Sequence, residues 1–78
     1  MESLLEGTER IQSEQFKDSS LLQIKIPKSV TTIESSAFKN CKMLTKVIFE
    51  EGSLLSHMEI DAFDGCDNLR ELSISNDY

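Results

Sequence analysis

The chain repeats one short phrase at a spacing that few folds can accommodate. Each copy places an apolar residue five positions before a phenylalanine. The copies cover residues 11–20, 33–42 and 58–67. Their phenylalanines, Phe16, Phe38 and Phe63, are 22 and 25 residues apart. A fixed period of roughly 20–50 residues predicts a solenoid, in which each repeat buries its apolar side chains only against its neighbours.

A second phrase follows each copy, with apolar residues at its first, fourth and sixth positions. It begins at Leu21, Leu44 and Leu69. The middle copy, 44–49, is rich in β-branched and aromatic residues and predicts a short strand. Segments 30–33 and 55–58 predict a second extended piece in each repeat, and 60–66 predicts a helical turn closed by Gly65. Equivalent side chains of successive repeats should then stack in columns about 5 Å apart, which is the spacing of paired strands.

These patterns predict an α/β repeat solenoid. The expected form is a short right-handed coil of about three repeats, with short parallel strands on one face and helical turns or irregular segments opposite. We expect repeats at about 10–31, 32–56 and 57–78. Residues 1–9, in which Leu4 and Leu5 precede Gly7, are expected to form a degenerate N-terminal cap or partial repeat. The 78 residues suffice for one domain.

The charge of the chain bears on the kind of partner that it can bind. The formal net charge is −6, which argues against nucleic-acid binding because a phosphate backbone attracts Lys and Arg. The chain is acidic over 1–20, basic over 21–46 and acidic over 47–78. These bands are either solvated surface, which is the favoured reading, or a pattern that steers a partner. No segment approaches the ~18 apolar residues of a membrane span, so no membrane insertion is expected.

Residues able to carry chemistry are few. Cys41 and Cys66 fall in one column, where stacked side chains point the same way, so two buried thiols are favoured over a disulfide. Two cysteines are also too few for a structural zinc site. His57, equivalent to Thr32, is expected at the surface. In the acidic segment 61–68, the Phe and Cys side chains are expected to be buried in the core. We therefore predict no catalytic, cofactor-binding or metal-binding residue and no enzymatic activity.

The longest run that carries a resemblance extends from Leu21 to Cys41. It reads Leu-Leu-Gln-Ile-Lys-Ile-Pro-Lys-Ser-Val-Thr-Thr-Ile-Glu-Ser-Ser-Ala-Phe-Lys-Asn-Cys and resembles the BspA-type leucine-rich repeat. Segments 44–53 and 62–66 continue the match. The chain departs from the family pattern with Glu34 and Glu59 at the usual glycine, and with Gln15 and Ser19 in place of the alanine and cysteine of the first copy. The resemblance implies non-enzymatic adhesins that bind host or matrix proteins, at the cell surface or secreted.

The surface expected to bind a protein partner is the outward side of the strands. Its residues are Leu22, Gln23, Lys25, Thr45, Lys46, Ile48, Arg70, Glu71 and Ser73. Repeat solenoids present extended surfaces of this kind to partners. Leu22 and Ile48 are apolar residues among charges, which suits a small binding hot spot, although scattered exposed apolar residues are also ordinary.

The residues leave two other expectations open, an alternative function and self-association. The start of the chain has acids where a signal peptide has a basic end and an apolar stretch. A small intracellular, cytoplasmic acidic binder or inhibitor, including a mimic of nucleic acid, is therefore the alternative function. Three repeats without a polar cap also leave sheet edges open, and open edges invite pairing between chains. We therefore expect a tendency to form an end-to-end homodimer.

Overall fold

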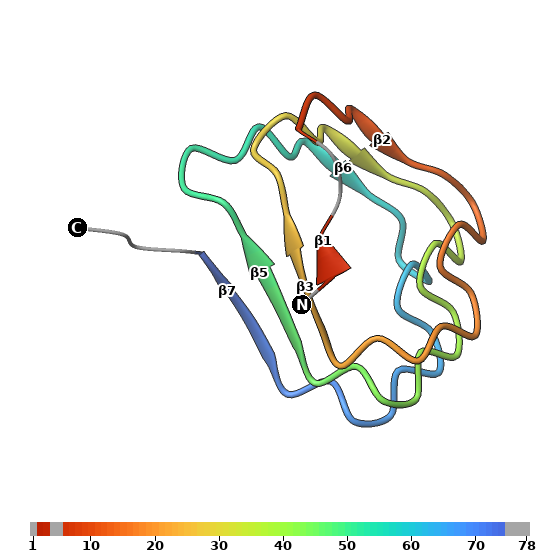
Figure 1. Cartoon of the computed structure of the whole chain (residues 1–78). Coiled ribbons are helices and arrows are strands. Elements are labelled where there is room, and N and C mark those ends of the chain that lie inside the picture. Colours follow the sequence, from red (N-terminus) through yellow and green to blue (C-terminus); the bar gives the residue numbers. More distant parts are fainter. Residues whose placement is uncertain (1, 4–5, 75–78) are drawn as a thin grey trace.

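Every regular element of the chain is a β-strand in the computed structural model, which describes residues 2–3 and 6–74 (Figure 1). The strands are β1 (Glu2–Ser3), β2 (Arg10–Ile11), β3 (Gln23–Ile26), β4 (Thr32–Ile33), β5 (Lys46–Phe49), β6 (His57–Met58) and β7 (Glu71–Ile74). They form two parallel sheets, ordered β1-β3-β5-β7 and β2-β4-β6. Leu4 and Leu5 of the expected N-terminal cap and residues 75–78 of the third expected repeat lie outside the described residues.

Strand pairing follows the repeat spacing of the sequence. In the larger sheet Ile24 pairs with Val47, and Val47 pairs with Leu72. In the smaller sheet Ile33 of β4 pairs with Ile11 on one side and Met58 on the other. The predicted columns of equivalent apolar residues are thereby confirmed for both sheets. A slip of one residue would turn each column to the outside, so burial of the columns holds this register.

The structure does not confirm the expected helical turns, because no residue of the described part of the chain is helical, and it shows irregular segments, the other expected form. The segments before each Cys or Ser19 are tight turns instead. In the middle repeat the Ala37 N–H donates to the Glu34 carbonyl at 3.2 Å, as a single helical turn would. Ser36 and Asn40, however, have φ of 61° and 60°, a left-handed conformation that cannot continue a right-handed helix.

Other amide N–H groups of the turn segments donate hydrogen bonds to the next repeat of the stack. Phe16 N–H donates to the Ala37 carbonyl of the next repeat at 2.8 Å, and Phe38 N–H donates to the Ala62 carbonyl at 2.8 Å. Hydrogen bonds between repeats therefore run through the turn segments as well as through the sheets. The α/β expectation is corrected to an arrangement of strands and turns, held together along the whole length of each repeat.

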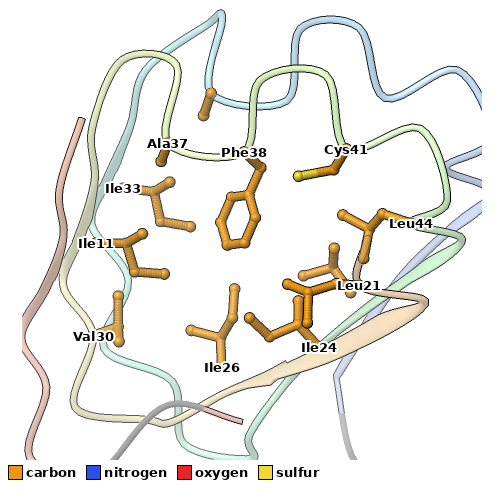
Figure 2. Close-up of a cluster of buried hydrophobic side chains, with 12 residues drawn as sticks. Ile11, Leu21, Ile24, Ile26, Val30, Ile33, Ala37, Phe38, Cys41 and Leu44 are labelled. Carbon is orange, nitrogen blue, oxygen red and sulfur yellow. The ribbon is translucent and has the colours of Figure 1, made fainter. Parts of the chain in front are cut away.

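The core lies between the two sheets and the turn segments (Figure 2). Phe38 is completely buried at its centre. Its ring stacks on Phe16 with ring centroids 5.1 Å apart and on Phe63 at 4.9 Å, with interplanar angles of 8° and 6°. The phenylalanine spacing that first indicated a repeat thus corresponds to a column of parallel rings, whose packing holds the turn segments against the sheets.

Candidate functional site

The predicted partner-binding residues lie on or directly before three neighbouring strands. Gln23, Lys46 and Glu71 form one row across β3, β5 and β7, and Lys25, Ile48 and Ser73 form another. Leu22, Thr45 and Arg70 come shortly before the three strands. All of them are exposed or half-buried, whereas the alternate residues Ile24 and Ile26 are buried. The alternation places the six residues within the strands on the outward side of the sheet, and Leu22, Thr45 and Arg70 are exposed just before the strands. We call the whole set of nine residues the strand face.

The strand face is positively charged, although the chain as a whole is negative. It carries Lys25, Lys46 and Arg70 against a single carboxylate, Glu71. The Lys46 Nζ lies 3.9 Å from the Glu71 carboxylate, and both side chains are well exposed, so this pair contributes little stability. Neither Lys25 nor Arg70 forms a salt bridge with another described residue. The face is therefore complementary to an acidic surface.

The backbone fixes the positions of the side chains on this face. Thr45 donates to the Leu22 carbonyl from its N–H at 2.9 Å and from its Oγ1 at 3.1 Å. One repeat later, the Arg70 N–H donates to the Thr45 carbonyl at 2.9 Å. Leu22 is 61% exposed and Ile48 is half-buried, so the face offers apolar contacts among its charges. A partner meets side chains held on paired strands, which limits the loss of conformational freedom on binding.

A second polar surface, over the smaller sheet, is one that the sequence reasoning missed. It is a shallow open hollow lined by Arg10, Ser13, Thr32, Glu34, Ser35, His57 and Glu59. Arg10 Nε lies 3.3 Å from the Glu34 carboxylate, and His57 Nε2 lies 2.8 Å from Glu59 Oε1. Arg10 pairs with Thr32, and Thr32 pairs with His57, at the repeat spacing. That spacing was the signal from which the sequence could have predicted this surface. The polar groups of the hollow therefore pair with one another, in exposed pairs that contribute little stability.

His57 is exposed, as the sequence predicts. In the described part of the chain no group of three or more His, Cys, Asp or Glu side chains is placed to hold a metal ion. Among the same residues, no helix is long and apolar enough to cross a membrane.

The two cysteines are free thiols, and each takes part in the stacking of the repeats. Cys41 Sγ donates to the Phe16 carbonyl at 3.1 Å, and Cys66 Sγ donates to the Phe38 carbonyl at 3.1 Å. Burial raises the pKa of Cys41 to about 11, with a smaller contribution from the neighbouring Cys66, and burial also raises the pKa of Cys66. At neutral pH both groups are protonated, which is the form that donates a hydrogen bond and reacts poorly as a nucleophile.

The comparisons with known proteins agree with this geometry. The family model described as the BspA type leucine rich repeat region (6 copies) matches residues 3–78. Neither the search of curated proteins nor the search of solved structures found a match. Leucine-rich repeats are in general non-enzymatic modules for protein–protein interaction. Because the family match extends over nearly the whole sequence and the strands pair at the repeat spacing, the chain belongs to the BspA-type leucine-rich repeat family.

Proposed function

We propose that this protein is a non-enzymatic binding module that recognises a host or matrix protein through the strand face. The observation that carries the proposal is the array that the strand-face residues form. Two complete rows of outward side chains cross β3, β5 and β7, and a third set lies just before the strands. This array presents a continuous surface on hydrogen-bonded backbone.

The chemistry of the array defines the partner more narrowly. Lys25, Lys46 and Arg70 favour an acidic surface, because opposite charges attract a partner over several ångströms and oppose cationic competitors. Leu22 and Ile48 supply apolar area between these charges, which is where binding energy tends to concentrate. The proposed partner is an acidic protein surface that includes an apolar patch.

The family supports a proposal for the place of action. Proteins with BspA-type repeats are usually surface-displayed or secreted, and we propose the same location for this chain, as a right-handed solenoid acting in adhesion. The paired strands and the stacked turns support that architecture.

The test is a charge reversal of the strand face. A Lys46→Glu/Arg70→Glu double variant is compared with a Lys17→Glu/Lys39→Glu double variant, which makes the same charge change on the turn segments. Binding to a panel of purified extracellular matrix proteins is measured by biolayer interferometry. We expect the strand-face variant to weaken binding by about tenfold or more, because each charge within an interface contributes on the order of 1 kcal/mol. Equal weakening by both variants would contradict the proposal.

A further inference from the structure

The three cations of the strand face lie on one oblique line across β3, β5 and β7, which are neighbouring strands in Figure 1. Lys25 pairs with Ile48, and Lys46 comes two residues before Ile48 on β5. Arg70 comes directly before Glu71, the residue of β7 that pairs with Lys46. Each step from one cation to the next therefore moves one strand across the sheet and one or two residues back along it. We call Lys25, Lys46 and Arg70 the cationic diagonal.

The spacing of the cationic diagonal fits an extended chain. The Arg70 N–H donates to the Thr45 carbonyl at 2.9 Å, which keeps Arg70 in the register of the strands. Strands lie about 4.8 Å apart and residues rise about 3.3 Å along them, so the Cα atoms of Lys25 and Arg70 are about 14 Å apart, with Lys46 near the middle. In an extended segment alternate side chains point to the same side, and its first, third and fifth residues span about 13 Å.

A helical segment matches the same line less well. Residues i, i+4 and i+8 of an α-helix span about 12 Å, but their side chains turn by about 80° around the helix axis over that distance. The outer two of three such carboxylates would point away from a line on the sheet surface. The cationic diagonal therefore favours an extended partner segment over a helix.

The middle cation already has a carboxylate beside it. The Lys46 Nζ lies 3.9 Å from Glu71 Oε1, whereas Lys25 and Arg70 form no salt bridge with another described residue. A partner carboxylate at Lys46 would lie next to Glu71 and be repelled by it, because like charges at short range oppose each other. The two side chains of this pair are 40% and 51% exposed, so Glu71 weakens binding at this position without preventing it.

Apolar side chains lie on both sides of the cationic diagonal. Ile48 is beside Lys25 on the neighbouring strand. Leu22 lies on the other side, three residues before Lys25 in the chain, and is 61% exposed. A segment that follows the diagonal passes between these two side chains, so an apolar residue next to its acidic positions is partly removed from water.

We propose that the partner binds through an extended acidic segment, which crosses β3, β5 and β7 obliquely and places carboxylates from three alternate residues against Lys25, Lys46 and Arg70. The proposal rests on the function proposed above for the strand face, and it narrows the partner to a sequence pattern with acids at every second position. Glu71 competes with the middle carboxylate of that segment for Lys46. It therefore limits the affinity of the site.

The first test compares two labelled peptides of identical composition by fluorescence anisotropy with the full chain. One has alternate acids, Gly-Glu-Ser-Glu-Ser-Glu-Ser-Leu-Gly, and the other has the acids in a block, Gly-Ser-Ser-Glu-Glu-Glu-Ser-Leu-Gly. In an extended block peptide only two of the three carboxylates point to the same side. At low ionic strength, where exposed charges are least screened, we expect the alternate peptide to bind with a Kd about threefold lower, the size of one exposed ion pair.

The second test changes the competing carboxylate. Glu71→Gln should lower the Kd of the alternate peptide about twofold to threefold, because it frees Lys46 and removes a repulsion. Glu59→Gln removes a comparable exposed carboxylate, paired with His57 on the smaller sheet, and should leave the Kd unchanged. A residue with a merely structural role would weaken binding when replaced, so tighter binding identifies competition.

The outcomes separate this proposal from the function on which it rests. Equal binding of the two peptides, or no gain from Glu71→Gln, overturns the extended acidic segment. If Lys46→Glu/Arg70→Glu still weakens binding to a matrix protein in that case, the function proposed for the strand face stands. If that double variant changes nothing, both fail. Displacement of a bound matrix protein by heparin but by neither peptide would assign the cationic diagonal to a sulfated polysaccharide and also overturn the proposal.

Discussion

The two ends of the stack are built from the same columns but differ in burial. At the N-terminal end β1 extends the larger sheet, and Ile24 is 1% exposed. Ile11 is 0% exposed, even though its strand is the edge strand of the smaller sheet. At the C-terminal end Leu72 and Met58, from the same two columns, are about half exposed. Full burial of such a side chain stabilises a fold by about 1.5–3 kcal/mol, so equivalent residues contribute differently at the two ends.

The largest expected difference concerns one column of the larger sheet. Ile24→Ala should lower the free energy of unfolding by about 3 kcal/mol, because it leaves a cavity between covered neighbours. Leu72→Ala should lower it by about 1 kcal/mol, because its side chain is already half in water. Urea unfolding followed by circular dichroism measures both values. Equal losses would show that the two ends are equally packed in solution.

A smaller effect is expected at the turns. Gly65 has a φ of +79°, and a Cβ there would collide with the Asn40 side chain and lie 3.3 Å from the Asn40 Cα. Gly52 has a φ of +82°, but a Cβ there meets only the end of Lys28, at 3.9 Å. Gly65→Ala should therefore cost about 2 kcal/mol and Gly52→Ala about 1 kcal/mol, the latter from the left-handed conformation alone. Thermal melts of the two variants test whether the third repeat is held tightly against the second.

The smallest effect is the pH dependence of stability that comes from Cys41, the buried cysteine of its column. The folded chain holds the Cys41 pKa at about 11, above its ordinary value of 9.0. Above pH 9 the unfolded chain loses this proton more readily than the folded one, so stability that is complete below pH 9 should fall as pH rises towards 11. Cys41→Ala should remove this part of the fall in Tm, which a pH series from 8 to 11 on both proteins measures.

The same column allows a direct comparison of access from solvent. Cys66 is half-buried and Cys41 is buried, so a water-soluble maleimide should label Cys66 first. Mass spectrometry of the Cys41→Ala and Cys66→Ala variants gives the two rates separately. Faster labelling of Cys41 would mean that the second repeat opens to solvent before the third repeat does.

Much of the fold is predictable from residue spacing. The strands follow from alternation at 44–49 and from the equivalent segments. The strand-face residues that lie within the strands follow from the same alternation, because successive side chains of a strand point to opposite sides. Leu22, Thr45 and Arg70 lie just before the strands, where alternation does not apply.

The turn segment 60–66 was misjudged as helical. A bond from an N–H to the carbonyl three residues earlier is common to a tight turn and to a short helix. In this segment the choice depends on the carbonyls of Ala62 and Asp64, which accept hydrogen bonds from Phe38 and Asn40 of the preceding repeat.

The polar hollow over the smaller sheet was missed for a related reason. Arg10 and Glu34 are distant in sequence, and so neither residue alone indicates the ion pair. Only the pairing of β2 with β4 brings them together. The charge of the strand face, by contrast, could be read directly, since its three cations lie in or just before predicted strands.

The sequence by itself determined the columns of this protein. A period of apolar residues that matches one repeat permits only one register with a buried core, and the spacing of Phe16, Phe38 and Phe63 specifies it. The tertiary structure decided how much of each column is buried, because the repeat pattern is the same in every copy but the cover over each copy is not. Leu72 and Val47 satisfy the same pattern, and within residues 6–74 only Val47 has a paired strand on both sides.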